Sequence, residues 1–189
     1  MQIISGKVRG KRLETLVTDN TRPTIGRIRE AVFNIIANKV KGSVVLDLFA
    51  GTGAYGAECL SRGAGRVTFN DMDKEAARII NKNTNFAKER AQVYSLDYMG
   101  ALDKIKLDII SRRRDKFTLV FLDPPYQSNF GLNAINYLVL KDMLATDALI
   151  VFETDKCGNW ACEFPKSLTY RFRDYGRVRV YFLEAKTIC

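Results

Sequence analysis

The chain has 189 residues, of which 47% are hydrophobic and 27% are charged, a composition typical of one globular domain. Lysine and arginine outnumber aspartate and glutamate by 30 to 21, and the isoelectric point near 9.5 favours a polyanionic partner. The sequence contains no histidine, which excludes a Ser-His-Asp triad, a Cys-His dyad and histidine metal ligands. Its four cysteines have no CxxC spacing, so we expect free thiols and no metal site.

The N-terminal sequence lacks the layout of a signal peptide, and no apolar run reaches the roughly 18 residues of a membrane span. We therefore expect a soluble, cytoplasmic monomer. The positive charge is concentrated at the two ends, because the net charge is +6 over residues 1–41, −1 over 42–164 and +4 over 165–189. This distribution predicts a basic N-terminal hairpin and helix extension at 1–41 and a Rossmann-like domain at 42–189.

The first elements expected in chain order are two short strands, 2–8 and 12–17, joined through Arg9-Gly10-Lys11 as a hairpin. The segment 21–24 should be extended, because the residue before a proline avoids the helical region. Thr24 is expected to cap a helix whose apolar residues recur every three or four positions as far as Val40.

From residue 43 onward the predicted strands and helices alternate, which indicates a doubly wound, mostly parallel sheet covered by helices on both faces. The chain should end in an antiparallel hairpin, 168–173 with 178–183, at the edge of that sheet. The expected strands are 44–49, 66–70, 92–96, 117–122 and 148–153, and the expected helices are 54–62, 74–90, 98–111 and 131–144.

A glycine-rich segment, Asp47 to Gly56, follows the first of these strands and opens a helix. Asp71 ends the next strand, 20 residues after Gly51, where a carboxylate can bind the two hydroxyls of a ribose. A nicotinamide dinucleotide and S-adenosylmethionine both carry such a ribose. Asp47 would repel a diphosphate but attract an ammonium and a sulfonium, so the sequence favours S-adenosylmethionine.

The end of the third strand supplies a further carboxylate, Asp97, placed to accept the adenine amino group beside the apolar cover of Tyr98. Asp97 could equally cap the helix that follows, and Asp73 is expected only to cap its helix. The residues expected to bind the cofactor are Asp47, Phe49, Ala50, Gly51, Thr52, Gly53, Asp71, Met72, Asp97 and Tyr98.

The tetrapeptide Asp123-Pro124-Pro125-Tyr126 ends the fourth strand and is the candidate catalytic segment. Two prolines remove two backbone donors, so this loop mainly offers hydrogen-bond acceptors. Acceptors from Asp123 and the Pro124 carbonyl would draw the hydrogens of a nucleobase amine out of plane and localise its lone pair, while Tyr126 stacks on the base. Direct displacement on a sulfonium methyl needs positioning and electrostatics and no histidine.

These motifs resemble those of the bacterial small-subunit rRNA guanine-N2 methyltransferases (the RsmD-like family), and the likeness runs nearly end to end. The segments that carry it are Ile3-Ile4-Ser5-Gly6, Arg9-Gly10, Thr21-Arg22-Pro23-Thr24, Arg29 to Asn34, the glycine loop, Asp71-Met72-Asp73 and Asp123 to Tyr126. One departure is Gly26, where family members often have an acidic residue. The resemblance implies a seven-stranded methyltransferase sheet and methylation of one guanine in 16S rRNA or the small ribosomal subunit.

The basic N-terminal segment is expected to hold rRNA phosphates, so that one guanine can be splayed toward Tyr126. The residues proposed for this contact are Arg9, Lys11, Arg12, Arg22, Arg27 and Arg29. Arg22 or Arg29 could instead help close the cofactor pocket. The RNA contact could also lie on the terminal hairpin, at Arg171, Arg173, Arg177 and Arg179, whereas Arg112 to Arg114 is expected to be a solvated loop.

Four other functions compete with this interpretation. A similar acceptor tetrapeptide serves methyltransferases that act on DNA adenine or on a protein glutamine amide, although DNA enzymes usually need a sizeable recognition domain. A non-catalytic RNA-binding module is disfavoured by the intact carboxylates and glycines. A nicotinamide oxidoreductase is disfavoured by Asp47, and cytosine-C5 methylation lacks a Pro-Cys nucleophile.

Overall fold

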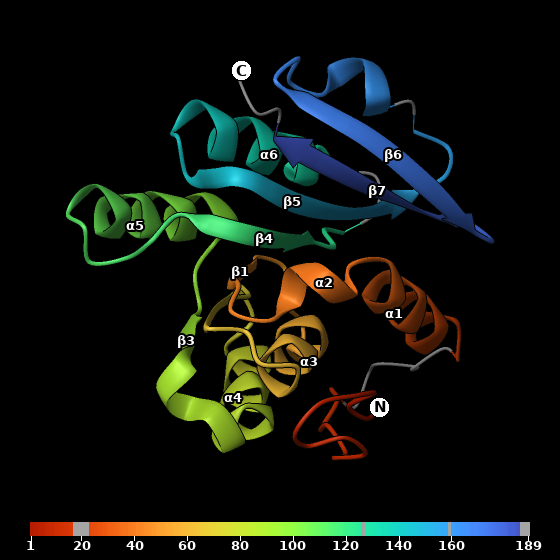
Figure 1. The fold of residues 1–189 in the computed structure, drawn as a ribbon, viewed down its shortest axis with the longest axis vertical. Coiled ribbons are helices and arrows are strands. Elements are labelled where there is room, and N and C mark those ends of the chain that lie inside the picture. The colour runs from red at the N-terminus through yellow and green to blue at the C-terminus, as the bar shows by residue number, and fades with distance from the viewer. Residues whose placement is uncertain (17–22, 126–127, 159, 186–189) are drawn as a thin grey trace.

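The computed structural model describes residues 1–16, 23–125, 128–158 and 160–185. Its centre is a seven-stranded sheet in the order β3-β2-β1-β4-β5-β7-β6 (Figure 1). The strands are β1 (Val44–Asp47), β2 (Arg66–Asn70), β3 (Ala91–Tyr94), β4 (Phe117–Leu122), β5 (Leu144–Asp155), β6 (Leu168–Tyr175) and β7 (Val178–Ala185). The first five are parallel, and β7 runs antiparallel to both β5 and β6. The doubly wound sheet and the terminal edge hairpin predicted from the sequence are confirmed.

Helices cover both faces of the sheet, as the absence of alternation in its strands requires. The helices are α1 (Pro23–Ile35), α2 (Ala37–Val40), α3 (Ala54–Ser61), α4 (Lys74–Asn83), α5 (Tyr98–Ile110) and α6 (Phe130–Leu140), with short 3-10 turns at Asn85–Arg90 and Trp160–Glu163. On one face, the four helices from α1 through α4 pack against Val45, Phe69 and Phe121 of the sheet. On the other face, α5 and α6 pack against Leu46 and Phe152. No helix in the described ranges is long and apolar enough to cross a membrane.

The segment proposed as an N-terminal extension is anchored to the rest of the chain. Phe33 of α1 is fully buried in the same cluster as β1 and β4. The backbone N–H groups of Ile4 and Ser5 donate to the carboxylate of Glu58 on α3, at 2.7 and 2.9 Å. Gly6, with φ of +91°, lies so close to α3 that a Cβ would come within 2.1 Å of the Ser61 carbonyl oxygen. The domain boundary at residue 41 stays a prediction.

The predicted N-terminal hairpin is wrong in detail, because only the bridge between Gln2 and Arg12 forms and no strand does so in residues 1–16. Backbone groups that would pair in a ladder bind Glu58 and Ser61 instead. The predicted cap at Thr24 is also wrong. Helix α1 begins one residue earlier, at Pro23, whose fixed φ suits the first helical position.

Two predicted helices are shorter in the structure. The helix predicted over 74–90 ends at Asn83, whose side-chain amide donates to the carbonyls of Thr52 and Glu14, and the chain continues as the 3-10 turn. The helix predicted to reach residue 144 ends at Leu140, because β5 begins at Leu144. Asp73 caps α4 as predicted, since its carboxylate accepts the Glu75 N–H at 2.8 Å.

The arginine run before β4 is only partly a solvated loop. Arg112 and Arg113 are exposed, but Arg114 is buried and donates to Thr68 on β2 and to Gln92 on β3. The expectation of a solvated Arg114 is therefore wrong, because its guanidinium ties two strands together.

Candidate active site at the carboxyl edge of the sheet

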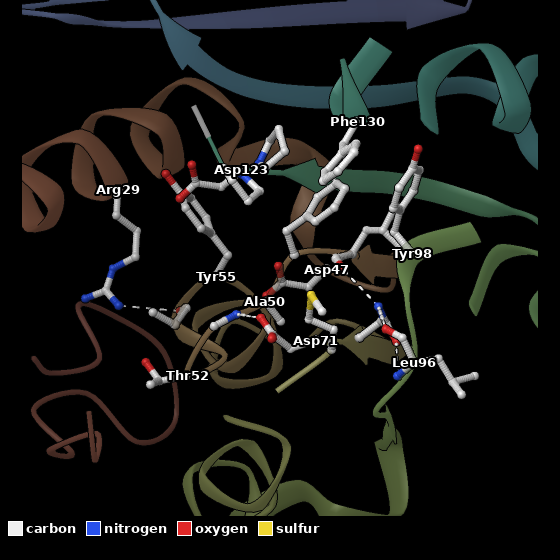
Figure 2. Close-up of a pocket in the computed structure, with 18 of the residues that line it drawn as sticks. Arg29, Asp47, Ala50, Thr52, Tyr55, Asp71, Leu96, Tyr98, Asp123 and Phe130 are labelled. Atoms are coloured by element: carbon white, nitrogen blue, oxygen red, sulfur yellow. Dashed lines mark hydrogen bonds between the residues drawn. The ribbon is translucent and has the colours of Figure 1, made fainter. Parts of the chain in front are cut away.

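A cavity of about 480 Å³ lies where β1, β2 and β4 end. In doubly wound sheets the carboxyl ends of the strands form the usual ligand crevice, at the point where the strand order reverses. Here the reversal falls at β1, between β2 and β4. Figure 2 shows Asp47, Asp71 and Asp123 arranged around this cavity, each from the end of a different strand.

The glycine loop after β1 is fixed by two carboxylates. Asp47 accepts the Gly56 N–H at 2.9 Å, and Asp71 accepts the Gly51 N–H at 2.8 Å. Gly56 packs so closely on Phe69 that a Cβ would come within 2.1 Å of the ring. The loop thus needs glycine for close packing, and Asp71 is held in place at the cavity wall.

Eight of the ten residues predicted to bind the cofactor line the cavity, namely Asp47, Phe49, Ala50, Gly51, Thr52, Asp71, Met72 and Tyr98. Gly53 and Asp97 do not. Gly53 lies beneath the loop at the start of α3, with φ of 79°. Asp97 caps α5, where its carboxylate accepts the Gly100 N–H at 2.9 Å, and its contact with adenine stays a prediction.

Aromatic rings form one wall of the cavity. The ring centroid of Tyr98 lies 5.5 Å from that of Phe49 and 5.0 Å from that of Phe130 (Figure 2). Phe130, at the start of α6, was not predicted from the sequence, and only its position shortly after the catalytic segment could have drawn attention to it. Such a wall suits the flat face of a purine ring.

The two central carboxyl groups have strongly shifted pKa values. The pKa of Asp47 is raised to about 7, chiefly by burial and in part by the neighbouring carboxylates of Asp123 and Asp71, while the Gly56 N–H opposes the shift. Asp123 is open to the cavity, but the surrounding protein removes enough water to raise its pKa to about 6. Among the described residues, no neighbouring cation offsets the shift of either carboxyl, so a cationic ligand beside Asp47 and Asp123 would be favoured.

A second acid near Asp123 was missed in the sequence. Glu153, in β5, is buried and accepts a hydrogen bond from the hydroxyl of Tyr55 on α3. The pKa of Glu153 is raised to about 8, chiefly by burial and in part by the charge of Asp123, while the hydrogen bond from Tyr55 opposes the shift. The signal was an acidic residue directly after the apolar run Ala148–Phe152. Tyr55 is held between Phe33 and Phe121, which orients its hydroxyl toward Glu153.

Arg29, one of the residues proposed to contact RNA, is buried. Only 3% of it is exposed, and it donates to the carbonyls of Gln2 and Ala54. Its Nε has no partner in the described part of the chain, and the residue lines the cavity (Figure 2). This burial leaves Arg29 little access to an external phosphate, and its location agrees with the alternative, that it helps close the pocket; its predicted contact with rRNA stays a prediction.

The other candidate residues fall in three groups. Pro124 and Pro125 line the cavity beside Asp123. Arg9, Lys11, Arg12 and Arg27 are exposed, as an RNA contact requires. Tyr126 and Arg22 lie outside the described residues, so their predicted roles stay predictions.

The sequence matches a known family over almost its whole length. A family model described as conserved hypothetical protein 95 matches residues 1–184. The ribosomal RNA small subunit methyltransferase D of Haemophilus influenzae is 36% identical over 156 residues, which are 82% of this chain and 79% of that protein. The protein of the same name from Escherichia coli is 33% identical over 82% of this chain and 75% of its own length.

Solved structures agree with this assignment. A putative methyltransferase of Escherichia coli has a TM-score of 0.82 at 30% identity, covering 99% of this chain and 98% of its own. A 16S rRNA N2 G1207 methyltransferase of Thermus thermophilus, in complex with AdoMet and guanosine, shares the fold with a TM-score of 0.69 at 17% identity, over 95% of this chain and 46% of that one. The chain therefore belongs to the ribosomal RNA small subunit methyltransferase D family.

Proposed function

We propose that this protein transfers a methyl group from S-adenosylmethionine to the exocyclic N2 amine of one guanine in 16S rRNA, within an assembling or assembled small subunit in the cytoplasm. The observation that carries the proposal is the meeting of Asp123 and the two prolines with the glycine loop and Asp71 at one cavity. The cavity therefore has room for both the cofactor and the amine that receives the methyl group.

The residues of the cavity fit this cofactor. Asp71 lies on the wall where it can accept both hydroxyls of a ribose. Asp47, whose burial holds its pKa near 7, gains an attractive partner if an ammonium or sulfonium lies beside it. When bound, S-adenosylmethionine supplies an electrophilic methyl group on a positively charged sulfur.

Arg29 offers the cavity a cation for the carboxylate of the same cofactor. Its unpartnered, buried Nε is costly unless a ligand satisfies it. A carboxylate beside Arg29 would be a charge-assisted partner. The cavity therefore has opposite charges for the two polar ends of a methionine moiety.

Asp123 and the Pro124 carbonyl activate the target amine in this proposal. The Pro125 carbonyl already accepts a hydrogen bond from Ser128 at 2.7 Å, whereas the Pro124 carbonyl accepts none from the residues that the structure describes. Two acceptors draw the amine hydrogens out of the plane of the base and localise the nitrogen lone pair. The nitrogen then bonds to the methyl carbon while the carbon–sulfur bond breaks toward sulfur, and Asp123 takes the proton that the nitrogen loses.

The two remaining candidate functions stay open to test. A DNA adenine or glutamine amide methyltransferase would use the same acceptors, and an RNA-binding module would use only the exposed arginines. The experiment supplies labelled S-adenosylmethionine with unmodified 16S rRNA, assembled small subunits, DNA and protein. Label in either ribosomal substrate supports the proposal, whereas label only in DNA or protein, or in none of the four, contradicts it.

A further inference from the structure

Two arginines at the tip of the terminal hairpin are exposed and free of salt bridges within the described residues. They are Arg173, near the end of β6, and Arg177, in the turn before β7. The other two arginines of this hairpin have acidic partners, since Arg171 lies 3.9 Å from Glu184 and Arg179 binds Asp174 at 2.7 Å. Arg173 and Arg177 are therefore the positive charges of this hairpin that an external anion can reach without displacing a carboxylate.

The strand register places Arg173 in one row with the candidate active site. Asp123 follows the last residue of β4, which pairs with Phe152, so it lies beside Glu153 on β5. Glu153 pairs with Val180 on β7, and Val180 pairs with Arg173 on β6. Because neighbouring strands are about 4.8 Å apart, three strand spacings separate Asp123 from Arg173 by roughly 14 Å. Figure 1 shows the hairpin tip projecting to the same side as α1, which bears the exposed Arg27.

Tyr175 is the last residue of β6, two residues after Arg173 and two before Arg177. It is half-buried against the cluster that contains Val180 and Phe182, and it interacts electrostatically with both Arg173 and Glu153. An aromatic ring beside arginines is the combination that binds single-stranded nucleic acid, because bases stack on the ring while guanidinium groups hold phosphates.

We propose that Arg173, Tyr175 and Arg177 bind the RNA strand next to the target nucleotide, with the arginines on phosphates and Tyr175 stacked on a neighbouring base. This inference rests on the proposed function, because it names the surface by which the substrate reaches the same site. A free phosphorylated molecule would share the charge contact, but it would not need the aromatic ring.

The test compares Arg173→Ala/Arg177→Ala with a matched control, Arg66→Ala/Arg112→Ala. The control also removes two positive charges, from exposed residues near the amino ends of the parallel strands, far from the hairpin tip. Binding of an unmodified 16S rRNA transcript is measured over a range of salt concentrations. The hairpin variant should bind severalfold more weakly, with a log–log salt slope shallower by about 1.4, because each phosphate contact on a single strand contributes roughly 0.7. The control should keep the slope of the unmodified protein.

Tyr175 provides a second, charge-independent test. Tyr175→Ala should weaken RNA binding by roughly fivefold or more without changing the salt slope, and Tyr175→Phe should restore it. Equal binding by the hairpin variant and the unmodified protein, or an equal loss in the control, would overturn the inference. The inference would also be overturned if inorganic triphosphate competed with RNA for the protein while Tyr175→Ala left RNA binding unchanged, because the site would then recognise phosphate alone.

The two proposals fail in different ways. If the unmodified protein methylates rRNA but the hairpin variant retains full RNA binding, only the hairpin inference is wrong. If the protein methylates no RNA while the hairpin variant still loses RNA binding, the proposed function is wrong. The melting temperature and S-adenosylmethionine affinity of each variant confirm that the fold and the cofactor pocket are intact.

Discussion

The two edges of the central sheet carry opposite charges. At the carboxyl edge, Asp47, Asp71 and Asp123 follow three strands and face one cavity. At the amino edge, a second cavity of about 440 Å³ is lined by Arg66, the run Arg112–Arg114 and Asp115. A chain with a net charge of +9 thus places three carboxylates around the cavity where a cationic ligand would bind.

Buried charges at the two edges differ in what they bind. At the amino edge, Arg114 is buried and donates hydrogen bonds to Thr68 and Gln92. At the carboxyl edge, burial raises the pKa of Asp47 and of Glu153, and the neighbouring carboxylates raise both further. Burial of like charges without a cation is destabilising by itself, so it indicates a site prepared for a ligand.

The largest effect is expected for Asp123→Ala. Loss of the acceptor that polarises the amine should lower the rate of methyl transfer by about 100- to 1,000-fold, similar to removal of one preorganised electrostatic group. Affinity for S-adenosylmethionine should change little. Single-turnover methylation and calorimetry measure the two quantities, and Arg112→Ala at the other edge is the control. A near-normal rate would contradict the role of Asp123.

The next effect is expected for Asp71→Ala. The loss of hydrogen bonds between a ribose and a charged acceptor should weaken S-adenosylmethionine binding by more than about 1 kcal/mol, which is more than about fivefold. Asp115→Ala, at the amino edge, removes an exposed acid of the same type and should leave affinity unchanged. Calorimetry that finds equal affinities for the two variants would remove Asp71 from the ribose site.

A smaller effect is the pH dependence that Asp47 causes. Its raised pKa means that the free protein is stabilised while this carboxyl is protonated, and that stability is lost as the pH rises through about 7. A sulfonium favours the ionised form, so affinity for S-adenosylmethionine should increase severalfold from pH 6 to 8. Subtracting the pH dependence of S-adenosylhomocysteine, which lacks the positive sulfur, isolates this term. Asp47→Asn should abolish the difference, and a difference that persists in this variant would point to another group.

The smallest effect is expected at Arg112, which adopts φ of 55° at the end of α5. This left-handed conformation costs a side chain free energy that glycine does not lose, although glycine adds entropy to the unfolded chain. Arg112→Gly should therefore raise the free energy of unfolding by less than about 1 kcal/mol and leave methyl transfer unchanged. Denaturant titration that shows destabilisation would mean that Arg112 has a stabilising contact in the fold.

The sheet could be predicted because its signals are local. Apolar strands without alternation indicate cover on both faces, and each of the first four strands is followed by a helical pattern. The N-terminal hairpin failed for the opposite reason. Its backbone partners, Glu58 and Ser61, lie about fifty residues away, and no local pattern in 2–17 announces them.

The candidate site divides in the same way. The glycine loop and the segment from Asp123 are contiguous motifs, so their chemistry is readable from the sequence. Glu153, Tyr55 and Phe130 reach the site from three different elements, and only the packed structure brings them together. The sequence left two roles open for Arg29, an RNA contact and closure of the pocket, because burial depends on tertiary contacts that composition does not contain.

The identity of the methylated nucleoside tests the proposed N2 methylation of a guanine in 16S rRNA. Unmodified 16S rRNA, free or assembled, is incubated with S-adenosylmethionine and either the unmodified protein or Asp123→Ala, and is then digested and analysed by mass spectrometry. We expect the amount of N2-methylguanosine to approach one per RNA molecule with the unmodified protein and to be close to zero with Asp123→Ala. Methylation on adenine, or N2-methylguanosine formed equally by both proteins, would contradict it.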